Sequence, residues 1–217
     1  MDKMQMQNDI AARVAKELEN GQYINLGIGL PTLVADHVPS GVKVLFHAEN
    51  GFIGLGPAPD EANIDPNIVN AGGQPSTILP GGAFFDSATS FGIVRGGHLD
   101  VTILGALQVD QKGNIANYMI PGKLVPGMGG AMDLLIGAKK VIVAMEHTAK
   151  GNPKILKECN LPLTAPSCVS MIITEMAVIK VVPEGLLLTE LRNGYSLEEV
   201  QAATDADLIV CKELKKL

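Results

Sequence analysis

The feature that most constrains the fold is a series of short apolar runs, many of them separated by helical segments. The run at 141–145 is apolar along its whole length instead of alternating with polar residues. Strands of this kind are buried on both faces, which is typical of a parallel sheet covered by helices. The sequence therefore predicts an α/β fold, a three-layer α/β/α arrangement around a largely parallel central sheet, with some antiparallel pairing near the C-terminus.

Local signals place the elements of this fold along the chain. Ile10, Val14 and Leu18 repeat at helical spacing before a stop at Gly21, and Ser196 and Glu199 form a capping box. The expected helices are 10–18, a short one through residue 38, one from residue 86 or 87 to 95, one starting at 131, one at 196–204 and at best a short one at 155–159. The expected strands are 23–26, 42–47, 77–79, 99–104, 115–120, 141–145, 171–174, 177–182, 186–191 and 207–211. Residues 54–76 are predicted to form a long, functional loop.

Composition limits the classes of protein to consider. With 217 residues, 47% hydrophobic and 18% charged, the chain suits a single domain spanning 1–217 with a substantial core. A net charge of -6 without a basic cluster argues against nucleic acid as a partner. There is no apolar run of membrane-spanning length, so no membrane partner is expected. The three cysteines lack metal-ligand spacing and are interpreted as reduced thiols of a cytoplasmic protein.

The stretch His47-Ala48-Glu49-Asn50-Gly51 is the leading candidate for a functional site. The apolar run 42–46 predicts a strand that ends there, and the following turn residues open the chain into a loop. Ligands gather at the carboxyl ends of strands in open α/β sheets. Small residues after Glu49 would let the reactive atom of another molecule come close. On local pattern alone, Glu49 could equally be a solvated turn residue.

A dinucleotide-binding site is one alternative. Gly27-Ile28-Gly29 follows a predicted strand, and Glu49 lies about 20 residues further on, as an acidic ribose ligand would. The third glycine position is Thr32, however, and Pro31 interrupts the motif. The signal for a dinucleotide-binding oxidoreductase is therefore weak.

A wider set of motifs, spread from about residue 10 to 210, gives a stronger indication. These motifs are Asn25-Leu26-Gly27-Ile28-Gly29-Leu30-Pro31, Glu49-Asn50-Gly51, Asn70-Ala71-Gly72-Gly73, Arg95-Gly96-Gly97-His98, Pro121-Gly122-Lys123, Gly127-Met128-Gly129-Gly130-Ala131-Met132-Asp133 and Met145-Glu146-His147. Together they resemble the β subunit of family I (3-oxoacid type) CoA-transferases, most closely the acetate/butyrate–acetoacetate type. The resemblance implies the CoA-transferase fold and an enzyme that moves CoA between an acyl-CoA and a short-chain carboxylate or 3-oxoacid.

The resemblance also implies roles for individual residues. Glu49 would be the nucleophile that carries CoA as a thioester, the backbone N–H of Gly130 an oxyanion donor, and Asn25 a contact to CoA. The other candidates for substrate and CoA binding are Gly27, Gly29, Asn50, Gly51, Gly129 and Lys123. Lys123 could face a CoA phosphate or only solvent. No metal site is expected, and CoA is a substrate, not a permanently bound cofactor.

Two positions depart from the family pattern. Ala48 stands where the family usually has a serine before the glutamate, and Gly73 stands where some relatives have a lysine that touches CoA. The second departure leaves open how the CoA phosphates are held. Family β subunits work beside a homologous α subunit, so an α2β2 heterotetramer is expected. A ligand-sensing or isomerase domain on a similar sheet remains an alternative, because a fold alone does not fix a function.

The four histidines, His37, His47, His98 and His147, share no metal-ligand spacing. Each is expected to be a hydrogen-bonded structural residue.

Overall fold

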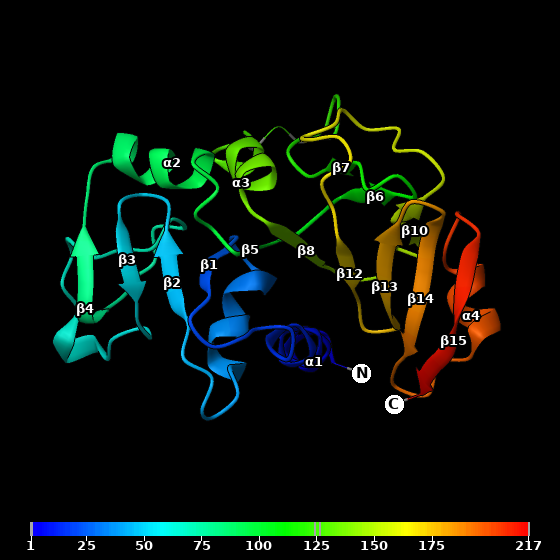
Figure 1. Ribbon diagram of the computed structural model, residues 1–217, viewed down its shortest axis with the longest axis horizontal. Coiled ribbons are helices and arrows are strands. Elements are labelled where there is room, and N and C mark those ends of the chain that lie inside the picture. The colour runs from blue at the N-terminus through cyan, green and yellow to red at the C-terminus, as the bar shows by residue number, and fades with distance from the viewer. Residues whose placement is uncertain (1, 124, 126, 217) are drawn as a thin grey trace.

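The computed structural model describes residues 2–123, 125 and 127–216. Within them, the main sheet has ten strands and runs from the C-terminal strand at one end to the fourth strand at the other (Figure 1). In spatial order the strands are β15 (Leu208–Lys216), β14 (Gly185–Leu191), β13 (Ala177–Val182), β12 (Met171–Ile173), β8 (Lys140–Ala144), β5 (Val101–Leu104), β1 (Tyr23–Leu26), β2 (Leu45–Ala48), β3 (Phe52–Leu55) and β4 (Ile78–Phe84).

The middle of this sheet is parallel, and its two ends are mixed. Strands β12, β8, β5, β1 and β2 pair in parallel with their neighbours. β3 and β4 continue it as antiparallel strands at one end; at the other, β13 and β14 are antiparallel and β15 is parallel to β14. The predicted largely parallel sheet is confirmed, and antiparallel pairing occurs at both ends instead of only near the C-terminus.

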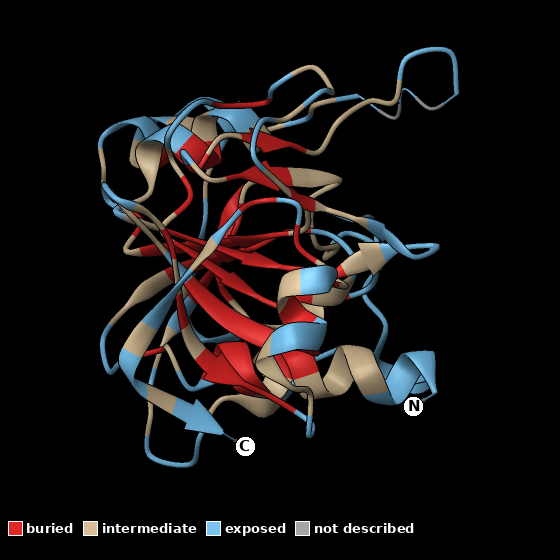
Figure 2. Cartoon of the chain, turned by 90° about the vertical axis from the view of Figure 1, so that its right-hand side faces the viewer, coloured by how far each residue is buried: buried red, intermediate tan, exposed pale blue. Residues whose placement is uncertain are grey.

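Helices cover both faces of the parallel region. These elements are α1 (Lys3–Ala15), the 3-10 helix η1 (Leu30–His37), α2 (Ser87–Arg95), α3 (Ala131–Gly137) and α4 (Leu197–Ala202). Along β8, Val141 and Val143 join one core cluster with α2 and α3, whereas Ile142 joins another with α1. Because neighbouring strand residues point to opposite faces, the two clusters are the two sides of a three-layer core. Buried residues fill the centre of the molecule in Figure 2.

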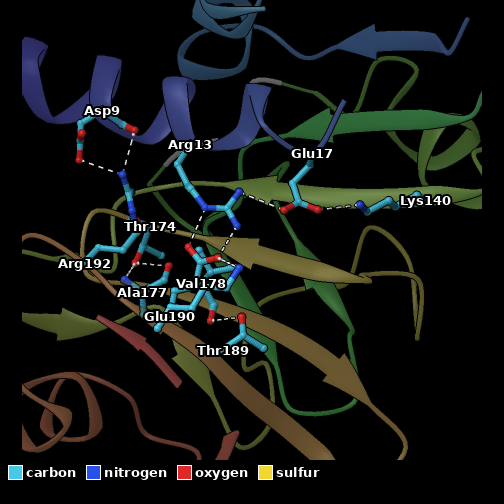
Figure 3. A network of polar contacts seen from close by, with 11 residues as sticks. Asp9, Arg13, Glu17, Lys140, Thr174, Ala177, Val178, Thr189, Glu190 and Arg192 are labelled. Atoms are coloured by element: carbon cyan, nitrogen blue, oxygen red, sulfur yellow. Dashed lines mark hydrogen bonds and ion pairs between the residues drawn. The ribbon is translucent and has the colours of Figure 1, made fainter. Parts of the chain in front are cut away.

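Side chains of α1 and of the segment just after it form ion pairs with the sheet and with the residue that follows β14 (Figure 3). The guanidinium of Arg13 makes two hydrogen bonds to the carboxylate of Glu190 on β14, at 2.7 and 2.8 Å. Glu17 accepts a hydrogen bond from Lys140 Nζ at 3.0 Å, and Arg192 Nη2 donates to Asp9 Oδ2 at 3.1 Å.

The capping signals predicted two helix starts correctly. Asp86 accepts a hydrogen bond from Thr89 N and caps α2, and the Ser196–Glu199 capping box opens α4. α1 begins seven residues earlier than Ile10, where the predicted helix began, and ends at Ala15.

Several predicted strands were wrong in extent or type. β2 begins at Leu45, not at residue 42, and β4 extends to Phe84. Residues 52–55, assigned to a loop, form β3. Residues 155–156, assigned at best to a short helix, form a strand. The smaller elements are the 3-10 turn η2 (Glu61–Asn63), β6 (Gln108–Asp110), β7 (Ile115–Ala116), β9 (Thr148–Ala149), β10 (Asn152–Pro153) and β11 (Ile155–Leu156). None of the helices in the described ranges is both long enough and apolar enough to cross a lipid bilayer.

Candidate active site

Glu49 lies at the tip of a tight hairpin and not at the start of an open loop. Ala48 of β2 pairs with Phe52 of β3, so only three residues connect the two strands. Gly51 N donates to Ala48 O at 3.0 Å, and Gly51 has a φ of 138°, a conformation that favours glycine. The expected exit into a loop at this point is therefore wrong, but the hairpin fixes Glu49 more firmly than a loop would.

A row of buried polar side chains lies beside this hairpin. His47 on β2, Asn25 on β1 and Thr102 on β5 are register partners across three adjacent parallel strands. All three are at most 1% exposed. Asn25 Nδ2 donates to Glu49 Oε2 at 2.8 Å and to His47 O at 3.3 Å. Asn25 therefore holds one carboxylate oxygen of Glu49 with a neutral amide.

Gly130 comes close to Glu49 from the other side. It is the N-cap of α3, and a methyl group on it would lie 3.7 Å from Glu49 Cγ and 2.8 Å from Phe91 Cζ. Phe91 belongs to α2, against which α3 packs. A side chain at this position would press on the Phe91 ring, so only glycine lets the start of α3 approach the carboxylate so closely.

Two hollows open on Glu49. The first, of about 440 Å³, is lined by the segment 55–59, residues 70–72 and 74–76, and parts of η1. The second, of about 550 Å³, is lined by Gly27, the segment 104–107, Asn117, Tyr118 and the loop 127–131. Glu49 and Ile28 line both, and Ile28 is 69% exposed. The carboxylate is therefore reachable by two ligand groups, one from each side.

The glycines predicted to bind substrate lie in different places around Glu49. Gly27 is packed tightly, because a Cβ there would lie 2.6 Å from Leu104 Cδ2. Gly27 and Gly129 line the second hollow, together with Gly130, the predicted oxyanion donor. Gly29 is exposed and accepts hydrogen bonds from Thr32, near the start of η1.

Of Asn50, Lys123 and the two positions that depart from the family pattern, only Ala48 is among the described residues that line the two hollows. Asn50 Nδ2 donates to Val69 O at 2.8 Å, which ties the hairpin to the long loop. Lys123 is exposed and is not among the described residues that line either hollow. Ala48 is buried inside the hairpin, and Gly73, with a φ of 75°, adopts a backbone conformation in which a lysine would be strained.

Two buried histidines are hydrogen-bonded, His147 through both ring nitrogens and His47 through Nε2 alone, since its buried Nδ1 has no partner among the described residues. His47 Nε2 lies 2.9 Å from Ser90 Oγ on α2, and burial lowers the pKa of His47 to about 4. His147 contacts the hydroxyls of Thr174 and Thr204 at 2.9 Å each. Burial, followed by the positive charge of Lys154, lowers the pKa of His147 to about 4. Both imidazoles are therefore neutral near pH 7.

Thr102 was not predicted from the sequence. Its hydroxyl donates to Asn25 Oδ1 at 3.4 Å. A hydroxyl inside an otherwise apolar buried strand was a signal that could have marked it, because a buried polar group needs a partner.

The geometry does not favour dinucleotide binding at Gly27-Ile28-Gly29. The helix that follows is the 3-10 helix η1 instead of an α-helix whose N-terminus could hold a pyrophosphate. Glu49 faces Asn25 and Gly130.

Comparison with known proteins shows the family to which this carboxylate site belongs. The model of the family described as Coenzyme A transferase matches residues 7–203. The chain belongs to the coenzyme A transferase family. The β subunit of the acetate CoA-transferase of Escherichia coli is 52% identical over 212 residues, covering 97% of each chain. One subunit of the succinyl-CoA:3-ketoacid coenzyme A transferase of Helicobacter pylori is 51% identical, covering 94% of this chain and 99% of the relative.

Solved structures agree with the fold. The acyl-CoA transferase (YdiF) apoenzyme from Escherichia coli O157:H7 has a TM-score of 0.78 and 25% identity, and the match covers 98% of this chain and 43% of that one. The chain thus spans less than half the length of that structure. The predicted resemblance to CoA-transferase β subunits and the predicted activity, CoA transfer, are confirmed, and neither the oxidoreductase nor the sensing or isomerase alternative is favoured.

Proposed function

We propose that residues 1–217 form one catalytic domain, the β subunit of a CoA-transferase, and that Glu49 is its nucleophile. The observation that supports this most strongly is the position of Glu49 at a rigid hairpin tip, with Oε2 held by Asn25 and both hollows open to the carboxylate. Among the described residues, no donor reaches Glu49 Oε1, so this oxygen is available to attack.

The reaction proceeds through two exchanges at the carboxylate. Glu49 Oε1 attacks the acyl-CoA carbonyl, and the C–S bond breaks to give a mixed anhydride and CoA thiolate. The thiolate then attacks the glutamyl carbonyl, a C–S bond forms, and the first acid leaves with Oε1 and the electron pair of the broken C–O bond. The second acid reverses both steps. This is nucleophilic catalysis with ping-pong kinetics.

A glutamate suits this chemistry because of the energy of its thioester. The thioester of Glu49 is itself a carboxylic thioester, so its free energy lies close to those of substrate and product. Transfer between two acids then needs no ATP. A serine nucleophile would form an oxygen ester and could not store the thioester energy in the same way.

Each tetrahedral intermediate carries a negative oxygen that needs donors. The backbone N–H of Gly130 is proposed to donate to one of these oxyanions, supported by the approach of Gly130 to the side chain of Glu49. Asn25 Nδ2 already contacts the oxygen that remains on the glutamyl carbonyl. Gly27, Gly29, Asn50, Gly51 and Gly129 are proposed to line the path of substrate and CoA, and Lys123 to contact CoA phosphate from the exposed loop.

The substrates are proposed from the relatives. Their names refer to acetate and to succinyl-CoA with a 3-ketoacid, so a short-chain carboxylate or 3-oxoacid of the acetate, butyrate or acetoacetate class is the proposed acceptor. CoA is bound only during turnover. The three cysteines are free thiols, which suits the proposed cytoplasmic location.

Relatives that match over nearly their full length are named as single subunits of larger enzymes, which implies an α partner. We propose an α2β2 assembly, because closed symmetry is usual for stable oligomers. CoA is polyanionic and this chain carries a net charge of -6. We therefore propose that the α partner forms the other side of the CoA-binding cleft and supplies further contacts to CoA.

The test is to express this chain alone and with its α partner, and to supply acyl-CoA without an acceptor acid. The complete enzyme should release a burst of free acid equal to the number of Glu49 sites, and then turn over when acetate, butyrate or acetoacetate is added. Steady-state rates should show the parallel-line pattern of ping-pong kinetics. Full activity of the single chain would contradict the proposed assembly, and the lack of a burst would contradict the covalent mechanism.

A further inference from the structure

The amide of Asn25 is held at both of its ends. Its Nδ2 faces Glu49 Oε2 and His47 O, and its Oδ1 accepts a hydrogen bond from Thr102 Oγ1 at 3.4 Å. In the part of the chain that the structure describes, no other donor reaches this Oδ1. Asn25 and Thr102 are both 0% exposed, so water cannot replace the Thr102 hydroxyl. A buried carbonyl oxygen left without a donor is costly.

The backbone places Thr102 within reach of Asn25 Oδ1, at a position where packing alone would not require a hydroxyl. Thr102 on β5 is the register partner of Asn25 on β1, so the two side chains are neighbours on one face of the sheet. Val101 and Ile103, on either side of it, point into the core on the opposite face. Valine has the same branched shape and the same stiff χ1 as threonine and would pack equally well. The hydroxyl therefore contributes its hydrogen bond, not its shape.

The charge of Glu49 changes during the reaction, and the Thr102 hydroxyl matters most when that charge is absent. At the start, Glu49 is a carboxylate, and a charge-assisted hydrogen bond holds the N–H of Asn25 toward it. Once Glu49 becomes an anhydride or a thioester, that charge is lost and the bond weakens. His47 O, at 3.3 Å, and the Thr102 hydroxyl then remain to keep the amide in place.

We propose that Thr102 is a positioning residue for CoA transfer: it holds the Asn25 amide so that its N–H stays aimed at Glu49 Oε2 through both half-reactions. The inference rests on the proposed role of Glu49. When CoA thiolate attacks the glutamyl carbonyl, the new C–S bond pushes electron density onto Oε2, and the acyl carboxylate leaves as the tetrahedral carbon collapses. A correctly aimed Asn25 N–H stabilises Oε2 at that moment.

The first experiment compares three variants in the complete enzyme with its α partner. Thr102→Val removes the hydroxyl and keeps the shape, Thr102→Ser keeps the hydroxyl, and Thr189→Val removes a hydroxyl that donates to Val178 O on distant strands of the same sheet (Figure 3). The readouts are the rate at which CoA becomes bound to Glu49 from acyl-CoA, and kcat and KM for the full reaction.

Thr102→Val should lower the rate of Glu49 labelling and kcat by about three- to tenfold, the effect of one hydrogen bond, with a smaller change in KM. Thr102→Ser should restore most of the rate, and Thr189→Val should leave it unchanged. Wild-type rates in Thr102→Val, or a failure of Thr102→Ser to restore the rate, would overturn the inference while leaving the thioester at Glu49 intact. Absence of CoA on Glu49 in the wild-type enzyme would instead refute the proposed function, and the inference with it.

A double-mutant cycle separates positioning from simple stability. If Thr102 acts through Asn25, Thr102→Val should have almost no further effect on labelling in the Asn25→Ala background. The same loss in both backgrounds would mean that Thr102 acts on the fold and not on Asn25, and would overturn the inference. This cycle decides the question even if Thr102→Val proves less stable to heat.

Discussion

Glu49 and Glu190 lie in two polar clusters of the same sheet, and their carboxylates differ in their hydrogen-bond partners. Glu190 is 5% exposed, and both of its oxygens are bound by the Arg13 guanidinium (Figure 3). The hydrogen bonds from Arg13 hold the pKa of Glu190 below its usual value. Glu49 has one oxygen on the neutral amide of Asn25, and it borders two hollows.

The difference shows what separates a structural carboxylate from a proposed nucleophile. A bidentate guanidinium neutralises the charge and occupies both oxygens, so Glu190 joins α1 to β14 and can do little else. An amide orients Glu49 without neutralising it and leaves one oxygen free. Substitutions confined to one cluster should therefore change either activity or stability, with the other cluster as the control.

The largest expected effect comes from changing each glutamate to glutamine. Glu49→Gln should lower CoA transfer by as much as about 10⁶-fold, because the nucleophile is lost. Its thermal stability should stay close to wild type, since the hairpin is unchanged. Glu190→Gln should instead keep its activity per folded molecule and lose stability. Acyl-CoA assays and thermal melts on the same preparations would measure both effects, and a stable, active Glu49→Gln would contradict the proposed role.

The second prediction breaks the buried ion pair from its other side. Arg13→Met leaves Glu190 buried without its partner, which typically costs about 3–5 kcal/mol of the free energy of unfolding. Lys215 Nζ, 3.9 Å from Glu190, offsets part of this loss. Denaturant unfolding would give the number. Activity of the folded fraction should be unchanged, and an unfolding free energy equal to wild type would show that the pair contributes nothing to stability.

The third prediction concerns the close approach of Gly130 to Glu49. Gly130→Ala places a methyl group 2.8 Å from Phe91 Cζ, so either the Phe91 ring or the start of α3 must move, and we expect α3 to move away from the carboxylate. Loss of one oxyanion donor lowers the rate by about 10²–10³-fold. Adding Phe91→Leu should relieve the contact and recover part of kcat. A Gly130→Ala enzyme with wild-type kcat, whose structure shows the start of α3 displaced from Glu49, would show that the Gly130 N–H is not a donor in the reaction.

The smallest effect is a dependence of stability on pH. The cluster that contains His47 and the cluster that contains Glu190 should show it in different pH ranges. The pKa of His47 is about 4 in the folded protein, below its ordinary value of 6.5, because it is buried. As the pH falls from 6.5 to 4, the unfolded chain binds a proton that folded His47 does not, so stability decreases by up to about 3 kcal/mol. Glu190, whose pKa is lowered, loses its contribution only as the pH falls below its usual value.

The free energy of unfolding, measured across pH 4–7, would test whether His47 and Glu190 affect stability in different pH ranges. His47→Gln should lower the slope of the curve between pH 6.5 and 4 by the contribution of about one proton, while the contribution of His147, whose folded pKa is also about 4, should remain. Glu190→Gln should leave the curve unchanged above the usual glutamate pKa of 4.5, because the pKa of Glu190 in the folded protein is lower still. An identical slope in wild type and His47→Gln would mean that His47 takes up its proton at the same pH in the folded protein as in the unfolded chain.

Much of this architecture could be predicted from sequence because the signals are local. The cap at Asp86, the capping box at Ser196 and the apolar run at 141–145 each depend on neighbours a few residues away. The end of a strand near Glu49 was predictable in the same way. The hairpin was not, because β3 is four residues long and contains Gly54, so its propensity resembles that of a loop.

The arrangement around the carboxylate depends on strand order, which local patterns do not contain. Asn25, Thr102 and Glu49 meet because β1 lies between β5 and β2. The two residues that flank Asn25 are thus 77 and 24 positions away along the chain. Glu49 was singled out by its place after a predicted strand, the resemblance to a family gave roles to it and to Asn25 and Gly130, and Thr102 was found only from its contact. A polar residue in a buried strand is visible in the sequence, but its partner is not.

The most direct test of the account is to find where CoA becomes attached. The complete enzyme is incubated with acyl-CoA and no acceptor, the adduct is trapped with borohydride or hydroxylamine, and the digested peptides are weighed. Before trapping, the peptide that contains Glu49 should gain the mass of CoA less one water, and the Glu49→Gln enzyme should gain nothing. CoA on another residue, or an unmodified Glu49 peptide while free acid is released, would contradict the account.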